Sequence, residues 1–362
     1  MTCDPWHYSR QELATHVLGM FESGLSSALV FFAPRRMGKT EFLCKDVAPL
    51  AEKAKWKVFY FSFLDVGMNA ANEFTKALTH FSKTHRTSRA GGILKRVNKL
   101  SAEVIGVKAE VQFQARIDSP AAIKEVIAAL CKKHKLLLLM DEVQTLTQDP
   151  ANANFIAALR TVLDMHKERV KVIFTGSSQE GLRRMFSEVK APFFHFGQNL
   201  PFPELDRGFT DHLANMFEKA TKRKLDRETL WTHFVNMQKV PQLARALVER
   251  VALNPHLSLD ESKKQLLSQI YDDRAFVAVW NQSSSLEKLL LKDISNGSSS
   301  PFSQETRDNY ANLLGVAEIT TTSVQSAIRV LKRKLLIGSI PEQRNYYIDD
   351  PNFKNWLFTL KL

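Results

Sequence analysis

Uninterrupted apolar runs alternate with helical spacing of apolar residues along the first half of the chain. The apolar runs cover residues 28–32, 57–63, 136–140 and 170–175. Continuous apolarity is expected of strands that are covered on both faces, and its alternation with helices is typical of a parallel sheet with crossover helices. The pattern therefore predicts an α/β core over residues 1–202.

Helical patterns dominate the second half of the chain, where the strand-like runs fade. Residues 203–280 predict a helical lid on the core. The polar residues 281–285 separate it from a final part in which two further helices precede two short strands. These four elements are expected at residues 304–314, 322–334, 336–340 and 345–348. That order predicts a winged-helix domain over residues 281–362.

A glycine, a lysine and a threonine follow the first predicted strand and open a helical run, in the segment APRRMGKT at positions 33–40. A phosphate-binding P-loop needs backbone N–H groups around the phosphates, a lysine that reaches them and a hydroxyl that binds Mg²⁺. Gly38, Lys39 and Thr40 supply the last three positions, while Ala33 stands where glycine is usual. The predicted nucleotide-binding residues are Ala33, Pro34, Arg35, Arg36, Met37, Gly38, Lys39, Thr40 and Glu41.

Two acidic residues end the apolar run at 136–140. P-loop ATPases need a carboxylate that organises Mg²⁺ at the end of such a strand, and Asp141 is predicted to fill this role together with Thr40. Glu142 is predicted to polarise the attacking water as general base. Gln144 lies in the same loop and is either an assistant to these acids or a surface residue.

Hydroxyl side chains follow the fourth predicted strand, in the segment TGSS at positions 175–178. A strand beside the metal strand can place a hydroxyl near the terminal phosphate, where it senses hydrolysis. We predict this role for Thr175 and Ser177, with Ser178 as a further candidate. A competing interpretation makes each of them a cap for the helix that begins near residue 179.

Composition is that of a globular protein, with 44% hydrophobic and 24% charged residues. The N-terminus has no apolar signal core, and no apolar run approaches the roughly 20 residues that span a bilayer. We therefore expect a cytoplasmic protein without a membrane partner. The three cysteines are too scattered for a disulfide framework or a zinc cluster.

The formal net charge of +12 is concentrated in one stretch of the chain. Residues 76–135 contain thirteen Lys and Arg against four Asp and Glu. We interpret this stretch as a basic insertion in the core, with Lys95, Arg96 and Lys99 at helical spacing so that one face can carry all three. Such a face could follow a DNA backbone, or it could simply be a solvated helix in a basic protein.

Basic residues also lie on or just after the second predicted helix of the winged-helix domain, where such domains meet nucleic acid. These candidates are Arg329, Lys332 and Arg333. Residues 301–362 nevertheless hold only eight Lys and Arg against six Asp and Glu. Because winged helices also dock proteins, a DNA partner and a protein partner both stay open for this domain.

The motifs together resemble the archaeal ATPase group, a branch of P-loop NTPases related to AAA+ and STAND proteins. The resemblance rests on segments at residues 8–13, 34–40, 140–146 and 175–178. It implies ATP and Mg²⁺ as cofactors, a helical lid and a C-terminal winged helix.

The sequence departs from the family's pattern at two places. His195 lies in a region where the family often has an arginine, and the Gly-x-Pro turn of family lids is replaced at residues 238–241, where Pro241 is the implied contact to the base.

The sequence thus predicts an ATPase whose nucleotide state controls assembly or conformation on DNA, as in helpers of replication, helicase loading or transposition. We expect it to form a homo-oligomer in the ATP state. The alternative is a STAND-type signalling or defence switch that acts through protein partners.

Overall fold

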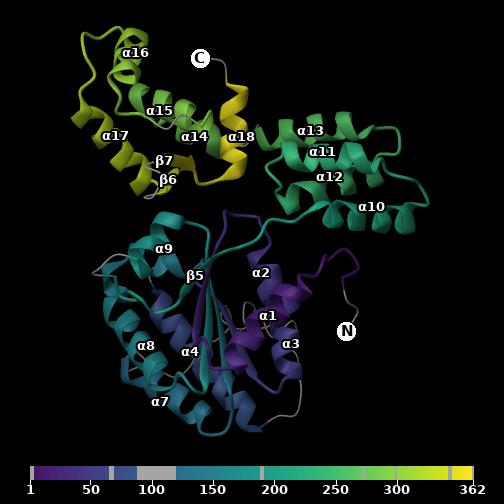
Figure 1. The fold of residues 1–362 in the computed structure, drawn as a ribbon, viewed down its shortest axis with the longest axis vertical. Coiled ribbons are helices and arrows are strands. Elements are labelled where there is room, and N and C mark those ends of the chain that lie inside the picture. The colour runs from purple at the N-terminus through teal and green to yellow at the C-terminus, as the bar shows by residue number, and fades with distance from the viewer. Residues whose placement is uncertain are drawn as a thin grey trace, which may run out of the picture.

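The computed structural model describes residues 4–64, 69–87, 120–187, 191–271, 274–297, 300–340 and 345–360. Figure 1 shows three parts: an α/β core, a group of helices that follows it in the sequence, and a C-terminal segment of helices with a small hairpin. Both later parts lie at the end of the core where α2 begins. The predicted α/β fold with a parallel sheet is confirmed.

Five parallel strands form the sheet of the core, in the order β2-β3-β4-β1-β5. Their bounds are Ala28–Phe32 (β1), Lys57–Ser62 (β2), Leu136–Asp141 (β3), Val170–Gly176 (β4) and Gln198–Pro201 (β5). The first four match the predicted strands. Strand β5 is not predicted from the sequence, because this edge strand is short, polar and largely exposed and so lacks an apolar run.

Helices cover both faces of the sheet (Figure 1). Helices α1 (Gln11–Glu22) and α3 (Ala48–Lys53) pack on one face, and helices α4 (Ala70–Thr87), α7 (Pro120–Cys131) and α8 (Ala153–Met165) pack on the other. Each face buries its own hydrophobic core. The two cores account for the continuous apolar character of the central strands, since their side chains alternate between faces that are both covered.

The chain after the first strand is less regular than the sequence suggested. A short helix α2 (Lys39–Glu41) leads into a π-helical turn η1 (Phe42–Val47) and only then into α3. A π-helical turn widens the helix by one residue and often marks a functional site. The predicted helix therefore exists, but a π-helical turn separates its α-helical start from α3.

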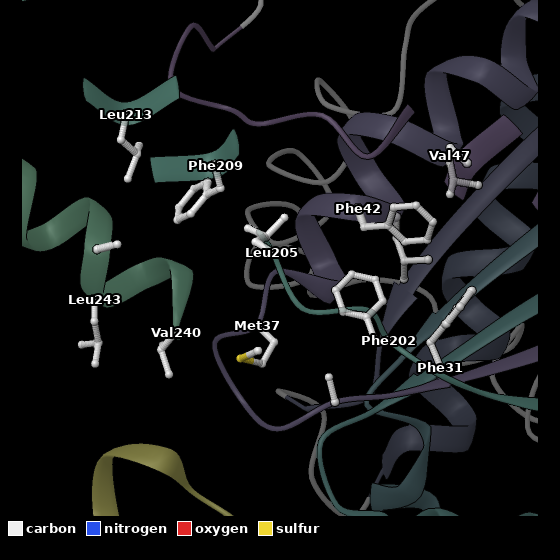
Figure 2. Close-up of a cluster of buried hydrophobic side chains, with 14 of the residues drawn as sticks. Phe31, Met37, Phe42, Val47, Phe202, Leu205, Phe209, Leu213, Val240 and Leu243 are labelled. Atoms are coloured by element: carbon white, nitrogen blue, oxygen red, sulfur yellow. The ribbon is translucent and has the colours of Figure 1, made fainter. Parts of the chain in front are cut away.

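Four helices follow the core: α10 (Arg207–Thr221), α11 (Arg227–Asn236), α12 (Pro241–Leu253) and α13 (Leu259–Tyr271). They share one hydrophobic core with the α1 face of the sheet. Figure 2 shows Met37, between the strand and α2, lying between Phe202 on one side and Val240 and Leu243 on the other. The core and these helices are thus joined by a continuous apolar cluster.

The C-terminal segment, defined as residues 274–360, has a separate hydrophobic core. Its elements are α14 (Arg274–Asn281), α15 (Ser285–Ser295), α16 (Gln304–Leu314), α17 (Thr321–Arg333), β6 (Ile337–Ile340), β7 (Asn345–Ile348) and α18 (Pro351–Thr359). The order of helices and hairpin agrees with the expected one, and its assignment as a winged helix stays a prediction. Helix α18 was not foreseen.

Helix α14 lies within the range predicted for the lid but packs with the C-terminal segment. The rings of Phe276 and Trp280 contact Trp356, and Phe276 also contacts Phe353. Because these aromatic contacts pack α14 against α18, we propose the boundary between the two parts before α14 instead of at residue 280.

Much of the predicted basic insertion lies outside the described residues. Lys95, Arg96 and Lys99 belong to this part, and so does the face proposed for them. The flanks of the insertion are helices α4 and α7, which pack against each other on the sheet. Among the described helices, none is both long and apolar enough to cross a membrane.

An aromatic cluster at the start of α4 should carry much of the stability of this face. Phe74 is fully buried and its ring contacts Phe59, Phe61, Phe63 and Phe155. We expect Phe74→Ala to lower the free energy of unfolding by about 3–5 kcal/mol, since it removes a large ring and leaves a cavity. Urea denaturation measures the loss.

The control is Phe358→Ala on α18, a ring that is 48% exposed, for which we expect a change below about 1 kcal/mol. Equal losses for the two variants would contradict the central place of Phe74.

Candidate functional site

The loop between β1 and α2 adopts left-handed backbone angles at two places. Arg36 has φ of 68° and Gly38 has φ of 88°. A Cβ atom added to Gly38 would meet nothing within 4 Å, so the glycine is required by the backbone conformation and not by lack of space. Loops that mix such angles form concave nests of N–H groups, which bind anions at helix N-termini.

Lys39 is held over this loop. Its Nζ donates to the carbonyl oxygens of Ala33 at 2.6 Å and Pro34 at 3.0 Å, and it lies 3.8 Å from Oε1 of Glu142. Burial lowers the pKa of Lys39, while the charges of Glu142 and Asp141 oppose that shift. The site thus places a buried cation beside the nest and next to a carboxylate.

Asp141 is buried and accepts hydrogen bonds on both oxygens. Thr40 donates to Oδ2 at 2.5 Å and Tyr60 to the same oxygen at 3.1 Å. Thr175 and the N–H of Glu142 donate to Oδ1. The carboxylate therefore joins β2, β3, β4 and α2 at one point. Tyr60 was not among the predicted residues, since a tyrosine in an apolar strand gives no sign of facing an acid.

Glu142 has a left-handed backbone, with φ of 55°. Its Oε2 accepts from Ser177 Oγ at 2.6 Å, Ser177 N at 3.2 Å and Gln144 Nε2 at 2.6 Å. Three donors fix one oxygen, and the other faces Lys39. This arrangement orients a carboxylate while leaving Oε1 for a further partner.

Two glycines make room for Gln144. A Cβ on Gly176 would collide with the Gln144 amide, and one on Gly181 would lie 2.8 Å from the side-chain carbons of Gln144.

Ser178 caps helix α9 (Gln179–Phe186), where its Oγ accepts from Gly181 N at 3.1 Å. The competing cap interpretation thus holds for Ser178, whereas Thr175 and Ser177 contact the two acids.

A cavity of about 720 Å³ adjoins the loop. Its walls include Arg35, Arg36, Met37, Gly38, Lys39, Thr40, Glu41, Glu142 and Pro241, as well as Trp6, Tyr8, Phe209 and Arg245. Ala33 and Pro34 face Lys39 instead of the cavity. The N-terminal segment, residues 4–10, and Arg245 were not predicted to line this cavity. A single sequence does not indicate that these distant parts of the chain lie together.

The turn before Pro241 departs from the Gly-x-Pro pattern in residue type but keeps a glycine-like backbone. Gln238 and Lys239 have φ of 58° and 49°. Such angles are unusual for residues with side chains. The turn conformation that a glycine would provide is thus formed here without one.

The N-terminal segment is fastened to the helix that follows the phosphate loop. His7 bonds Asp46 at 2.9 Å and Glu41 at 3.2 Å, and Ser9 donates to Asp46 at 2.7 Å. Burial disfavours the charged ring, but the bonds to the two acids outweigh it and raise the pKa of His7 to about 9. The hydrogen bond between His7 and Glu41 is also the main cause that lowers the pKa of Glu41, to about 2.

The residues present fit Mg²⁺ bound together with a nucleotide. Among the described residues, no group of three or more His, Cys, Asp and Glu side chains forms a metal site by itself. Mg²⁺ in nucleotide sites is held by one or two protein oxygens plus phosphate oxygens and water. The adjacent oxygens of Thr40 and Asp141 are such a donor set.

The remaining predicted residues lie on α17, in the C-terminal segment. Arg329 and Arg333 are exposed. Lys332 donates to Ser339 at 2.8 Å and its ammonium group lies over the ring of Tyr346. Lys332 thus has a structural partner in the hairpin.

The sequence matches the model of a family described as an ATPase domain predominantly from Archaea, over residues 8–234. The chain belongs to this family. It is accordingly a P-loop ATPase, as the motifs predicted. No curated protein matches the sequence.

Two solved structures share the fold over nearly the whole chain. A Walker-type ATPase of Pyrococcus abyssi has a TM-score of 0.69 at 14% identity, with 97% of this chain and 96% of that chain covered. The ORC2 protein of Aeropyrum pernix, in ADPNP–ADP complexes, has a TM-score of 0.55 at 15% identity, with coverage of 96% and 91%. At these identities the likeness shows the fold alone.

The His7 bonds predict a pH-dependent contribution to stability. Because the pKa of His7 is raised from 6.5 to about 9 on folding, its contribution is complete below pH 6.5 and lost as the pH rises through 9. We expect His7→Gln to lower the urea midpoint at pH 6 and to matter much less at pH 10.

Comparison with His16→Gln, at an exposed position on α1, isolates the effect of His7 from general alkaline destabilisation. A His7→Gln deficit that is the same at both pH values would refute the assigned pKa.

Proposed function

We propose that this site hydrolyses ATP and that its nucleotide state controls assembly or conformation on DNA. The arrangement of Glu142 supports hydrolysis most directly, since one oxygen is fixed by Ser177 and Gln144 while the other lies beside Lys39. The ATPase family gives independent support. The ORC2 protein of Aeropyrum pernix, which shares the fold, forms complexes with ADPNP and ADP, and this supports nucleotide binding here.

Each residue has a role in this proposal. The loop amides and Lys39 bind the phosphates, and Thr40 and Asp141 hold Mg²⁺. Bound there, Mg²⁺ would neutralise charge on the phosphate oxygens. Glu142 Oε1 accepts a proton from the attacking water, while its other oxygen stays bonded. Thr175 links Asp141 to strand β4, so that it can report on the metal.

The base would lie in the part of the cavity formed by the N-terminal segment and the helices after the core. Trp6, Tyr8 and Phe209 supply aromatic surface, and Pro241 lies at the start of α12. Flat aromatic and apolar groups suit a purine ring. Pro241 is thus proposed as a base contact, as the family resemblance implied.

A DNA partner is supported by charge. The described end of the basic stretch, with Lys135, lies at the edge of the sheet opposite the phosphate loop, next to Lys57 and Lys171. The pKa of Lys171 is lowered mainly by burial; the charge of Glu168 opposes this shift, and the charges of Lys135 and Lys167 add to it. Grouped cations repel one another, and a phosphate backbone would relieve that cost.

A protein partner is the alternative, and it corresponds to a STAND-type switch. The C-terminal segment has little excess charge. It exposes Leu313 near the end of helix α16 and Val316 just after that helix. A homo-oligomer in the ATP state is proposed with either partner. Tight nucleotide retention without an effect of DNA would favour the protein-based switch.

Ser177 should matter for the rate and not for substrate binding. We expect Ser177→Ala to lower kcat roughly tenfold or more with little change in KM, because Glu142 loses a charge-assisted hydrogen bond that orients it. Steady-state ATP hydrolysis measures both constants.

The neighbouring Ser178→Ala is the matched control. It removes a helix cap, costing about 1 kcal/mol of stability, and should leave kcat nearly unchanged. If the two variants lose the same activity, Ser177 has no special role in the rate.

The test of the proposed function is ATP hydrolysis with and without double-stranded DNA. DNA should raise a rate that Lys39→Ala and Glu142→Gln abolish. Reversing the charges of Lys95, Arg96 and Lys99 should remove the stimulation, and a second variant with Arg329 and Arg333 reversed tests the C-terminal segment separately. A rate that no DNA concentration alters would exclude the DNA role and leave the protein-based switch.

A further inference from the structure

The amino ends of three neighbouring strands carry a high concentration of positive charge. Three short segments precede and begin strands β2, β3 and β4, at residues 53–57, 132–135 and 166–171. Together they contain nine lysines and arginines and a single acid, Glu168. The nine cations are Lys53, Lys55, Lys57, Lys132, Lys133, Lys135, Lys167, Arg169 and Lys171. These three segments are called the amino-end surface below.

Backbone pairing holds the three segments side by side. The N–H of Lys57 donates to the carbonyl oxygen of Lys135 at 2.8 Å, and the N–H of Leu136 donates to that of Arg169 at 2.8 Å. Lys171 is the second residue of β4. Because neighbouring strands lie about 4.8 Å apart, the first residues of the three strands lie within about 10 Å of one another. The sheet thus fixes these cations in a row across its end.

The charge of this row is not neutralised by nearby acids. Seven of the nine side chains are exposed, and within the described residues no carboxylate forms an ion pair with any of the nine. Asp164 lies close in the sequence, but it is paired with Arg160 at 2.8 Å. Burial mainly lowers the pKa of His134, and the charges of Lys57 and Lys133 add to this shift. Cations held together in this way repel one another, and an anionic partner would lower that cost.

The side chains of the amino-end surface fit phosphate groups better than they fit bases or lipid. Eight of the nine cations are lysines, which bind phosphate as point charges. Trp56 is the one Trp, Tyr or Phe of the three segments, and at 3% exposure it offers no surface on which a base could stack. Leu25 and Met165 are exposed at the same end, but they are single side chains on separate segments, whereas a lipid surface is held by a broad apolar face.

We propose that the amino-end surface binds the phosphate backbone of double-stranded DNA, at the end of the core opposite the nucleotide site. A duplex carries one negative charge per roughly 1.7 Å of its axis, so a row of cations about 10 Å wide faces several phosphates. In Figure 1 this end of the core points away from the helices that follow it in the sequence. This inference rests on the DNA part of the proposed function and adds the contact surface to it. Because phosphates and not base edges are contacted, binding is independent of sequence and strongly dependent on salt.

The test measures the affinity of the full chain for two unrelated DNA duplexes of equal length, by fluorescence anisotropy over a range of salt concentrations. The variant combines Lys133→Glu, Lys135→Glu and Lys167→Glu, all at exposed positions. We expect it to weaken binding of both duplexes equally, by about tenfold or more at low salt. The slope of log affinity against log salt should become less steep by about 2–3, since each lost phosphate contact removes about one.

The matched control combines Lys219→Glu, Lys224→Glu and Lys264→Glu, which are exposed positions in and between the helices after the core. Each reversal removes two positive charges, so both triple variants lower the formal net charge from +12 to +6. The control should keep the wild-type affinity within about threefold, because distant charges are screened by salt. ATP hydrolysis without DNA should be unchanged in both variants, which shows that the fold and the nucleotide site are intact. Equal losses of DNA affinity in the two variants would overturn the inference.

The inference and the proposed function can fail separately. If DNA binds to the wild type and the amino-end variant keeps the same affinity, only the inference fails, and the DNA contact lies elsewhere. If the wild type binds no DNA, the DNA part of the proposed function fails together with the inference, while Lys39→Ala and Glu142→Gln still test hydrolysis. Binding to anionic phospholipid vesicles without binding to DNA, lost in the amino-end variant, would also overturn the inference and assign this surface to a membrane.

Discussion

A single buried carboxylate sets the geometry of the nucleotide site. Burial of the Asp141 carboxylate is costly unless its oxygens accept hydrogen bonds. The donors come from Thr40, Tyr60, Thr175 and the next backbone N–H. These groups belong to three neighbouring strands and to the helix after the phosphate loop. The hydrogen bonds to Asp141 therefore fix the position of the phosphate loop relative to the carboxyl ends of these strands. Glu142, the next residue, is positioned as a consequence.

The parts of the fold that the sequence predicts are those whose signal lies in residues adjacent along the chain. The four central strands follow from apolar runs, and the phosphate loop follows from adjacent residues that end in Gly38, Lys39 and Thr40. Strand β5 escapes prediction because its residues are polar and its place depends on pairing with β1. The π-helical turn after the loop escapes it because apolar spacing does not distinguish one kind of helical winding from another.

The site is predicted less completely, for a different reason. Asp141, Glu142, Thr175 and Ser177 stand at strand ends, where parallel strands bring side chains together. Tyr60 and Arg245 come from segments whose neighbours are decided only by tertiary packing. Left-handed angles at Glu142, Gln238 and Lys239 show the same limit, since local preference disfavours them and only the surrounding structure can hold them there.

Met37 gives the phosphate loop an apolar attachment to the helices after the core. Its side chain is buried in the cluster that those helices share with the sheet (Figure 2). Any swing of α10 and α12 away from the core would bring this apolar surface into water, which raises the heat capacity of the protein. Opening and closing of the site would therefore have a temperature-dependent enthalpy, so the balance between the two positions would itself shift as the protein is warmed or cooled.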